Sequence, residues 1–238
     1  MTILTLAQLE EIRNFDVPTI SNALERFNVR SRIEGYMTPD IKQIIPYERT
    51  MIGYACTAKV SAANPPTPEQ QAMWMKYAAK VQSTPRPSIT VIEDVDPTPV
   101  GSFWGEVNAT QHKSLGCVGT ITNGGVRDLK EVESLGFGFY ASCVLVGHGY
   151  THVEDYDCPV TFGGVTIKPG DLLAADKHGV VIIPNEFAAE LANACRKIAT
   201  AEMPVLEGCR RAIIEGKEVN LDELKQWRSE MAKLRTAK

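Results

Sequence analysis

The stretch CVGTITNGGVRDLKEVESLGFGFYASCVLV, residues 117–146, contains the pattern that decides the fold. Residues 117–121 are mostly apolar and β-branched, which predicts a buried strand, and the adjacent Gly124 and Gly125 predict a tight turn. Residues 129–135 then show helical spacing, and residues 139–146 form a second β-rich run. Strand, turn, helix and strand in this order are typical of a βαβ unit, so we predict an α/β fold.

On the C-terminal side of this unit, short β-rich runs alternate with glycine and proline. Four runs predict a layer of short strands rich in β-hairpins: residues 160–162, 165–167, 172–174 and 180–183. Residues 185–215 predict a long helix capped by Asn185, and residues 222–238 predict an amphipathic helix with a basic end.

On the N-terminal side, helical and β-rich segments alternate. We expect helices at about 6–12 and 17–27, a strand at 51–60, a helix at 69–81, a strand at 88–95 and a helix at 103–115. Pro68 suits the first turn of the third of these helices. The whole chain, 1–238, is expected to form a single domain, with its core at about 20–184 and a C-terminal helical extension at 185–238.

Composition narrows the class of protein. The 238 residues carry a net charge of −4, with 25 Lys and Arg against 29 Asp and Glu. This leaves no basic surplus for a nucleic-acid backbone. No run approaches the ~18 apolar residues of a membrane span, and the start, residues 1–15, carries Glu10 and Glu11 where a signal peptide is basic and then apolar. We therefore expect a cytoplasmic protein that binds neither nucleic acid nor membrane.

Cysteine usage points to a reducing compartment. Six cysteines occur without a Cys-x-x-Cys pair, at positions 56, 117, 143, 158, 195 and 209. Several stand in apolar runs. We expect buried, reduced thiols, with disulfides and a structural zinc as the weaker alternatives.

The turn after the first βαβ strand carries the most informative polar residues. Glycine lets the backbone approach a ligand closely, Arg127 offers a fork for a carboxylate, and Asp128 offers a hard oxygen ligand for a divalent cation. Together they suit an anionic substrate that chelates a metal. The alternative is that Asp128 caps the following helix and that Arg127 is an ordinary surface residue.

A second candidate is the start of the helix expected at 103–115. After Gly105, the backbone N–H groups of Val107 and Asn108 can receive a carboxylate or enolate oxygen, while Glu106 can hold water on a metal ion. A solvated glutamate in the first helical turn is an equally good interpretation.

The histidines suggest a metal cluster that the local sequence disfavours. His148 and His152 stand four apart with acidic residues close behind, but the glycines around His148 argue against the helix that a zinc site of this spacing needs. We expect His148, His152 and His178 to lie near the mouth of a site or to form hydrogen bonds in turns. His112, on a helix face, is expected to be structural.

Other catalytic classes lack their motifs. The chain has no phosphate-binding loop, no dinucleotide-binding glycine fingerprint and no Gly-x-Ser-x-Gly elbow. Schiff-base chemistry needs a lysine of lowered pKa in an apolar setting, and the lysines near the candidate motifs stand in charged or turn contexts instead: Lys113, Lys130, Lys168 and Lys177.

Taken together, the ordered motifs resemble the RraA-like family. They are Gly105-Glu106, the run Gly124 to Asp128, the segment Pro159 to Asp171, and His178 to Pro184. The family includes 4-hydroxy-4-methyl-2-oxoglutarate aldolases and regulators of ribonuclease E. The resemblance covers about residues 20–205 and implies a swivelling α/β/α (β/β/α) domain that forms homotrimers or homohexamers with the active site at a subunit interface.

The resemblance also implies a role for each candidate residue. Arg127 would bind the pyruvyl part of the substrate, and Asp128 would bind Mg²⁺ or Mn²⁺. The residue matching Glu106 contacts water on the metal. The backbone of Val107 and Asn108 would receive the substrate carboxylate. A glutamate of the neighbouring subunit's C-terminal helix, matching Glu202, would complete the water network.

The sequence also departs from the family pattern. Glu106 replaces the usual aspartate and is one methylene longer, which moves its carboxylate by about 1 to 1.5 Å. Residues 146–152 and the turn around His178 are unlike the known aldolases, so we expect the distal half of the substrate to differ. The ribonuclease regulators generally end soon after the last sheet strand, whereas this chain continues to Lys238, which favours the enzymatic branch.

The resulting prediction is a metal-dependent lyase, a class II pyruvate aldolase that cleaves a 4-hydroxy-2-oxo acid by a retro-aldol reaction. A side activity as an oxaloacetate decarboxylase is expected. Two alternatives remain: an enzyme of the same fold acting on another enolisable oxo acid, and a non-catalytic binding protein resembling the ribonuclease regulators.

Overall fold

The computed structural model, which describes residues 3–236, is built around one long strand. All but one of the 11 residues of β2 (Met51–Ser61) are buried, and β2 pairs with three other strands. The eight-stranded sheet has the order β1-β6-β4-β3-β2-β11-β12, with β8 also paired to β2. The pairs β2–β3, β3–β4 and β4–β6 are parallel, and the outer pairs are antiparallel.

Helices and short strands complete the elements. The helices are α1 (Leu6–Arg13), α2 (Val17–Glu25), α3 (Pro68–Ser83), α4 (Glu106–Ser114), α5 (Leu129–Leu135), α6 (Ala188–Ile214) and α7 (Leu221–Thr236). The remaining strands are β1 (Lys42–Ile45), β3 (Ser88–Asp94), β4 (Cys117–Thr122), β5 (Gly125–Val126), β6 (Gly138–Ala141), β7 (Cys143–Val144), β8 (His152–Tyr156), β9 (Val160–Phe162), β10 (Val165–Ile167), β11 (Leu172–Asp176) and β12 (Gly179–Ile183).

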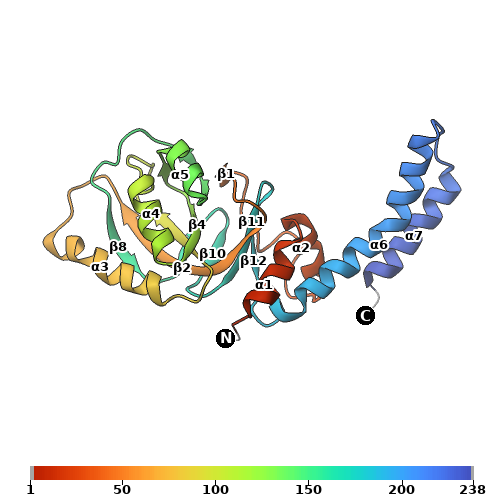
Figure 1. Ribbon diagram of the computed structural model, residues 1–238, viewed down its shortest axis with the longest axis horizontal. Coiled ribbons are helices and arrows are strands. Elements are labelled where there is room, and N and C mark those ends of the chain that lie inside the picture. Colours follow the sequence, from red (N-terminus) through yellow and green to blue (C-terminus); the bar gives the residue numbers. More distant parts are fainter. Residues whose placement is uncertain (1–2, 237–238) are drawn as a thin grey trace.

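The hydrophobic core has three parts, which follow from the alternation of side chains along β2. Ile52 and Tyr54 pack with α1, α2 and α6, whereas Cys56 and Ala58 pack with α3, α4 and α5. Met51 and Ala55 point to the opposite face, where the β9–β10 hairpin covers the sheet. One face of the sheet therefore carries helices and the other carries short strands (Figure 1).

The expected α/β fold is confirmed, with its layer of short strands and its C-terminal helices. The βαβ unit is β4–α5–β6, whose strands are parallel neighbours. The second half of α6 projects from the body together with α7 (Figure 1). The two helices of this arm pack closely, since a Cβ on Gly208 would lie 2.5 Å from the ring of Trp227.

Several boundaries differ from expectation for reasons that lie outside the local sequence. The helix expected at 103–115 begins at Glu106, because the backbone of Trp104 forms a β-bridge with Val126. The strand expected at 139–146 divides, since β6 stays in the large sheet while β7 pairs with β5. Strands β1 and β8 were not expected at all. Residues 237–238 of the last expected helix lie outside the described residues.

The expected cap of the long helix was wrong. Phe187 occupies the N-cap position of α6 and makes no side-chain cap hydrogen bond. Asn185 instead donates from Nδ2 to the carbonyl oxygen of Gly170, at 3.3 Å. Its side chain therefore secures the loop before β11 and not the helix.

The cysteines are free thiols, as expected. Cys56, Cys117 and Cys195 are buried, and burial raises the pKa of Cys117 and of Cys195 to about 12. Such thiols stay protonated and unreactive near neutral pH. Among residues 3–236, none of the helices combines the length and hydrophobicity needed to cross a lipid bilayer.

Candidate active site

Two loops that are far apart in sequence meet at the carboxyl end of β4. The backbone N–H of Arg127 donates to the carbonyl oxygen of Trp104 at 3.0 Å, next to the bridge between Trp104 and Val126. Ser102 is buried under both loops and donates to the carbonyl oxygens of Trp104, at 2.6 Å, and Gly125, at 2.8 Å. These bonds hold the segment that begins α4 beside the segment that carries Arg127 and Asp128.

Asp128 joins the two loops through its side chain. Its Oδ2 accepts a hydrogen bond from the backbone N–H of Glu106 at 2.9 Å, so it satisfies one of the free donors at the start of α4. Asp128 also stands at the N-cap position of α5, but makes no cap hydrogen bond there. The sequence alternative of a cap for the following helix is therefore wrong, because this side chain caps α4 instead.

The backbone of Asp128 is left-handed, with φ 55° and ψ 44°. This conformation is uncommon for residues other than glycine and is concentrated at functional sites. It turns the carboxylate back toward α4.

Gly105 leaves the space that this arrangement needs. A Cβ on Gly105 would lie 2.5 Å from Oδ2 of Asp128 and 3.1 Å from Nε of Arg127. The glycine is therefore required because the carboxylate and the guanidinium pass directly over its backbone.

Arg127 lies beside the carboxylate, with Nε 3.7 Å from Oδ2 of Asp128. Its NH1 is 3.5 Å from the carbonyl oxygen of Val146, and about a third of its side chain is exposed. The ion pair is too long and too open to contribute much stability. The guanidinium fork is consequently available to an anion in the adjoining cavity.

The first turn of α4 supplies further donors. The backbone N–H groups of Val107 and Asn108 precede the first intrahelical bond, which Ala109 makes to Gly105 at 2.9 Å. They remain open to a ligand, as helix N-terminal groups usually do. Asn108 fixes the turn by donating from Nδ2 to the carbonyl oxygen of Phe103 at 2.6 Å.

The carboxylate of Glu106 is exposed and accepts no hydrogen bond from the part of the chain that the structure describes. Only its backbone N–H is engaged, by Asp128. Its side chain is therefore free to reach a ligand or water.

These groups line one small cavity of about 220 Å³. Its walls are Ser102, Phe103, Gly105, Val107, Asn108, Arg127, Asp128, His148 and Thr151. The structure thus brings together five of the seven predicted site residues, with Glu106 directly adjacent. Ser102, Phe103 and Thr151 were missed, because no local signal marks them and only the crossing of three loops brings them here.

The histidines behave largely as expected. His148 lies at the mouth of this cavity, and its Nδ1 is 2.8 Å from the carbonyl oxygen of Gly149. His152 pairs with Glu154 at 2.8 Å, and His178 pairs with Asp176 at 3.1 Å. His112 is fully buried and structural.

A divalent cation is compatible with this geometry. Oδ2 of Asp128 is held by Glu106, which leaves Oδ1 directed away from that bond, and the described residues make no hydrogen bond to it. Mg²⁺ commonly uses one or two carboxylates and completes its shell with water and substrate oxygens. Residues 3–236 contain no group of three or more His, Cys, Asp or Glu side chains that could hold a metal ion.

Glu202 lies on α6, in the arm, and its Oε1 accepts a hydrogen bond from NH2 of Arg235 on α7 at 2.5 Å. Within one chain, Glu202 is therefore outside the cavity that holds Asp128. Its role in a neighbouring subunit's site stays a prediction.

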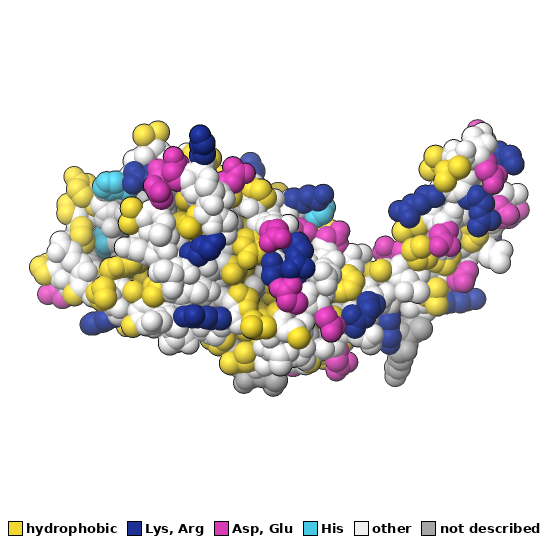
Figure 2. Space-filling model, in the orientation of Figure 1, with side chains coloured by type: hydrophobic (Ala, Val, Ile, Leu, Met, Phe, Trp, Pro, Cys, Tyr) yellow, Lys and Arg dark blue, Asp and Glu magenta, His cyan; other side chains and the backbone are white. Residues whose placement is uncertain are grey.

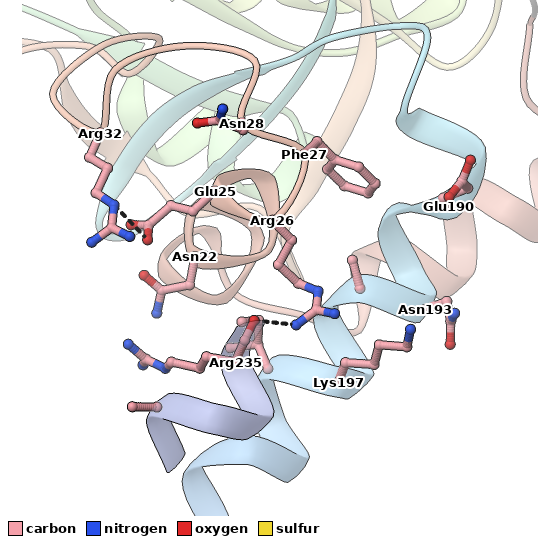
Figure 3. A pocket seen from close by; sticks show the side chains of 13 residues that line it. Asn22, Glu25, Arg26, Phe27, Asn28, Arg32, Glu190, Asn193, Lys197 and Arg235 are labelled. Carbon is pink, nitrogen blue, oxygen red and sulfur yellow. Dashed lines mark hydrogen bonds and ion pairs between the residues drawn. The ribbon is translucent and has the colours of Figure 1, made fainter. Parts of the chain in front are cut away.

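A larger cavity, of about 610 Å³, lies between α2 and the helices α6 and α7 (Figure 3). It contains none of the predicted site residues. Its arginines are used in packing, because Arg32 pairs with Glu25 at 3.2 Å and Arg26 donates to the carbonyl oxygen of Arg235. We regard it as a crevice between helices and not as the active site.

Two proteins of known sequence are similar to this chain. Protein DlpA of Legionella pneumophila is 27% identical over 215 residues, which cover 87% of this chain and 32% of DlpA. A Halalkalibacterium halodurans protein provisionally named 4-hydroxy-4-methyl-2-oxoglutarate aldolase is 33% identical over 73 residues, which cover 30% of this chain and 35% of that protein. The matches thus span about a third of each of these two relatives.

A solved structure of an uncharacterised protein from Pseudomonas syringae has the same fold. Its TM-score is 0.72 at 23% sequence identity, over 96% of this chain and 95% of that one. Residues 17–182, well over half of the chain, match the RraA-like family, described as Aldolase/RraA. The chain therefore belongs to the RraA-like family.

Proposed function

We propose that this protein is a divalent-metal-dependent lyase that cleaves a 4-hydroxy-2-oxo acid, such as 4-hydroxy-4-methyl-2-oxoglutarate, to pyruvate. The observation that carries the proposal is the cavity in which Asp128, Arg127 and the first turn of α4 converge. A carboxylate for a hard cation, a guanidinium and free backbone donors together suit a chelating 2-oxo acid. The provisional name of the Halalkalibacterium relative points to the same reaction.

Asp128 would hold Mg²⁺ or Mn²⁺ through the oxygen that Glu106 does not engage. When bound, the cation supplies Lewis acidity toward the carboxylate and the 2-oxo oxygen of the substrate. The volume of the cavity, about 220 Å³, is below the ~300 Å³ at which sites for drug-sized ligands begin, which suits a small metabolite.

The chain's own residues divide the remaining work. Backbone N–H groups of Val107 and Asn108 bind the substrate carboxylate. Arg127 stabilises the negative charge that develops on the 2-oxo oxygen as the bond between C3 and C4 breaks. Water held by Glu106, and by Glu202 of a neighbouring copy, accepts the proton of the 4-hydroxyl group and returns a proton to C3.

The role of Glu202 requires a homo-oligomer, and the arm supports one. Exposed apolar side chains are spread along the arm among charged ones, including Met203, Leu206, Ile213 and Ile214 (Figure 2). Such residues are costly to leave in water over a large area. We propose that the arm packs on a neighbouring subunit in a trimer or hexamer.

Pyruvate release tests the function. We would follow it from 4-hydroxy-4-methyl-2-oxoglutarate and from oxaloacetate, each with Mg²⁺, with EDTA, and with the Asp128→Ala variant. Activity that needs both metal and Asp128 is expected, with oxaloacetate decarboxylation as a side activity. Metal binding without pyruvate from either compound would favour another enolisable oxo acid, and absence of metal binding would favour a non-catalytic binding protein.

A further inference from the structure

The loop that carries Arg127 and Asp128 is held at its base by one amide side chain. Asn123 directly follows β4, and its Oδ1 accepts a hydrogen bond from the backbone N–H of Asp94 at 2.7 Å. Its Nδ2 donates to the carbonyl oxygen of the same residue at 2.8 Å. Both polar atoms of the amide are thus used by the last residue of β3.

These bonds continue the sheet beyond the point where its backbone pairing stops. The last backbone pair between β3 and β4 is Ile92 with Thr122. Asn123 is one residue past Thr122, and its side chain makes two hydrogen bonds to the backbone of Asp94, as the backbone of a paired strand would. It therefore fixes where β4 ends and where the loop leaves the sheet.

Two other residues, Ser142 and Asp96, form similar hydrogen bonds to the backbone at this end of the sheet. Ser142, just after β6, donates to the carbonyl oxygens of Asn123, at 2.6 Å, and Gly124, at 3.2 Å. Asp96, just after β3, accepts from the hydroxyl of Ser61 and the N–H of Ala62, both at 2.7 Å. We call Asp96, Asn123 and Ser142 the edge clasps, because each binds the end of the adjacent strand or the residues directly after it.

The turn that Asn123 and Ser142 hold, at Gly124 and Gly125, is closely packed. A Cβ on Gly124 would lie 3.0 Å from Oδ2 of Asp94, and one on Gly125 would lie 2.5 Å from Cδ1 of Leu145. The N–H of Gly124 also donates to the hydroxyl of Thr122 at 2.9 Å. A shift at Asn123 would therefore be passed on to Asp128, five residues later.

From this arrangement we infer that Asn123 is a positioning residue for the proposed metal site, acting on Asp128 through the turn. The inference rests on the proposed function only in taking Asp128 as the metal ligand. Replacing a residue that hydrogen-bonds a metal ligand directly typically changes metal affinity by 10- to 100-fold, so a residue that acts through the backbone of the turn should change it by about tenfold.

The test measures the dissociation constant for Mn²⁺ by calorimetry, together with the stability to urea. Asn123→Ala should raise the dissociation constant by about tenfold, and excess Mn²⁺ should restore part of the pyruvate release. Ser142→Ala removes the clasp on the other side of the turn and should raise the constant in the same direction, by a smaller factor. It serves as the second variant if Asn123→Ala does not fold.

Thr120→Val is the matched control. The hydroxyl of Thr120 donates to the carbonyl oxygen of Thr90 at 3.1 Å, so it also links β4 to β3, but in the middle of the strands. Loss of this hydroxyl should lower the free energy of unfolding. The affinity for Mn²⁺ should stay within about twofold of the wild type, since changes at well-separated positions usually act independently.

The outcomes separate the two proposals. If the wild type binds Mn²⁺ and Asn123→Ala binds it equally well while being less stable, the assignment of Asn123 is overturned and the proposed function stands. If wild-type binding is absent, or is unaffected by Asp128→Ala, the proposed function fails and the assignment fails with it.

Discussion

Asp128 would combine two tasks that usually fall to different residues. One oxygen of its carboxylate caps α4 through the N–H of Glu106, and the other is left for the proposed cation. The left-handed backbone makes this possible, at a conformational cost of roughly 1–2 kcal/mol for a residue with a Cβ. The cap hydrogen bond and the surrounding loop contacts offset that cost.

Replacement of Arg127 tests the charge on the substrate side of the site. Arg127→Ala should lower kcat/KM for pyruvate release at least a hundredfold, because losing a preorganised donor to a developing oxyanion costs roughly 3–4 kcal/mol. Arg127→Lys should recover only part of this loss, since it keeps the charge but not the planar fork. A loss below tenfold in the alanine variant would contradict the assigned role.

Gly105 provides a test that adds an atom and removes none. Gly105→Ala should lower activity by about a hundredfold, as expected for a displacement of roughly 1 Å at a reacting centre. The added Cβ meets Asp128 and Arg127, and φ at this position is −157°, which alanine adopts without strain. Urea unfolding should show a loss of only about 1 kcal/mol, because displacing Oδ2 of Asp128 weakens its cap on α4. Normal kinetics in this variant would mean that the carboxylate can move without consequence.

At the scale of elements, α4 links the site to the core. Its first turn faces the cavity, while His112 near its other end is buried among the rings of Trp74, Phe103 and Trp104. Nδ1 of His112 lies 2.6 Å from the carbonyl oxygen of Asn108, and Nε2 lies 2.9 Å from the hydroxyl of Tyr77. The first hydrogen bond requires a proton on Nδ1, so the neutral ring accepts from Tyr77 through Nε2.

The burial of His112 predicts that the protein loses stability at acidic pH. Burial lowers the pKa of His112 to about 4, from an ordinary value of 6.5, so protonation favours the unfolded chain. The contribution of the neutral His112 ring to the free energy of unfolding is fully present above pH 6.5. It is lost as the pH falls toward 4, by about 3 kcal/mol in total. Burial also raises the pKa of Asp94 to about 6, which acts in the opposite direction over part of this range.

Comparing the wild type with the His112→Gln variant isolates the effect of the histidine on pH-dependent stability, because Asp94 is present in both proteins. The free energy of unfolding in urea should fall more steeply between pH 6.5 and 4 in the wild type than in the variant. At pH 7 the variant should be less stable by about 1–3 kcal/mol, since the glutamine side chain cannot serve both the hydroxyl of Tyr77 and the carbonyl oxygen of Asn108. Equal slopes in the two proteins would exclude His112 as the source.

At the scale of the whole molecule, one chain would present only part of the proposed site. Residues between Ser102 and Thr151 line the cavity with Asp128. Glu202 lies on α6, whose second half projects from the body together with α7 (Figure 1). Glu202 pairs with Arg235 inside the arm. If the arm reaches a neighbouring subunit, this pair is carried to that subunit's cavity as one unit.

Mixing two inactive variants tests the shared site. Asp128→Ala and Glu202→Gln should each lose most activity, and an equimolar co-refolded mixture should recover up to about a quarter of wild-type activity, because each copy then lacks a different half. Light scattering of the wild type should give the mass of a trimer or hexamer. A monomer, or a mixture that stays inactive after verified subunit exchange, would contradict the shared site.

The sequence by itself determined the βαβ unit, the short-strand layer and the C-terminal helices, because their signals are local: apolar runs, helical spacing and glycine turns. It also marked Arg127 and Asp128, since both stand beside a glycine turn after a buried strand. Strands β1 and β8 had no such signal. Their pairing partners, β6 and β2, lie about a hundred residues away, and only tertiary pairing defines them.

Only the tertiary structure decided how the marked residues are used. The start of α4 at Glu106, the cap that Asp128 supplies to it, and the approach of His148 to the cavity all depend on contacts between distant segments. The two hydrogen bonds of Asn123 to Asp94 are of the same kind. Local propensity selects a strand, turn or helix, whereas the direction of a side chain at a site is set by which loops the folded sheet brings together.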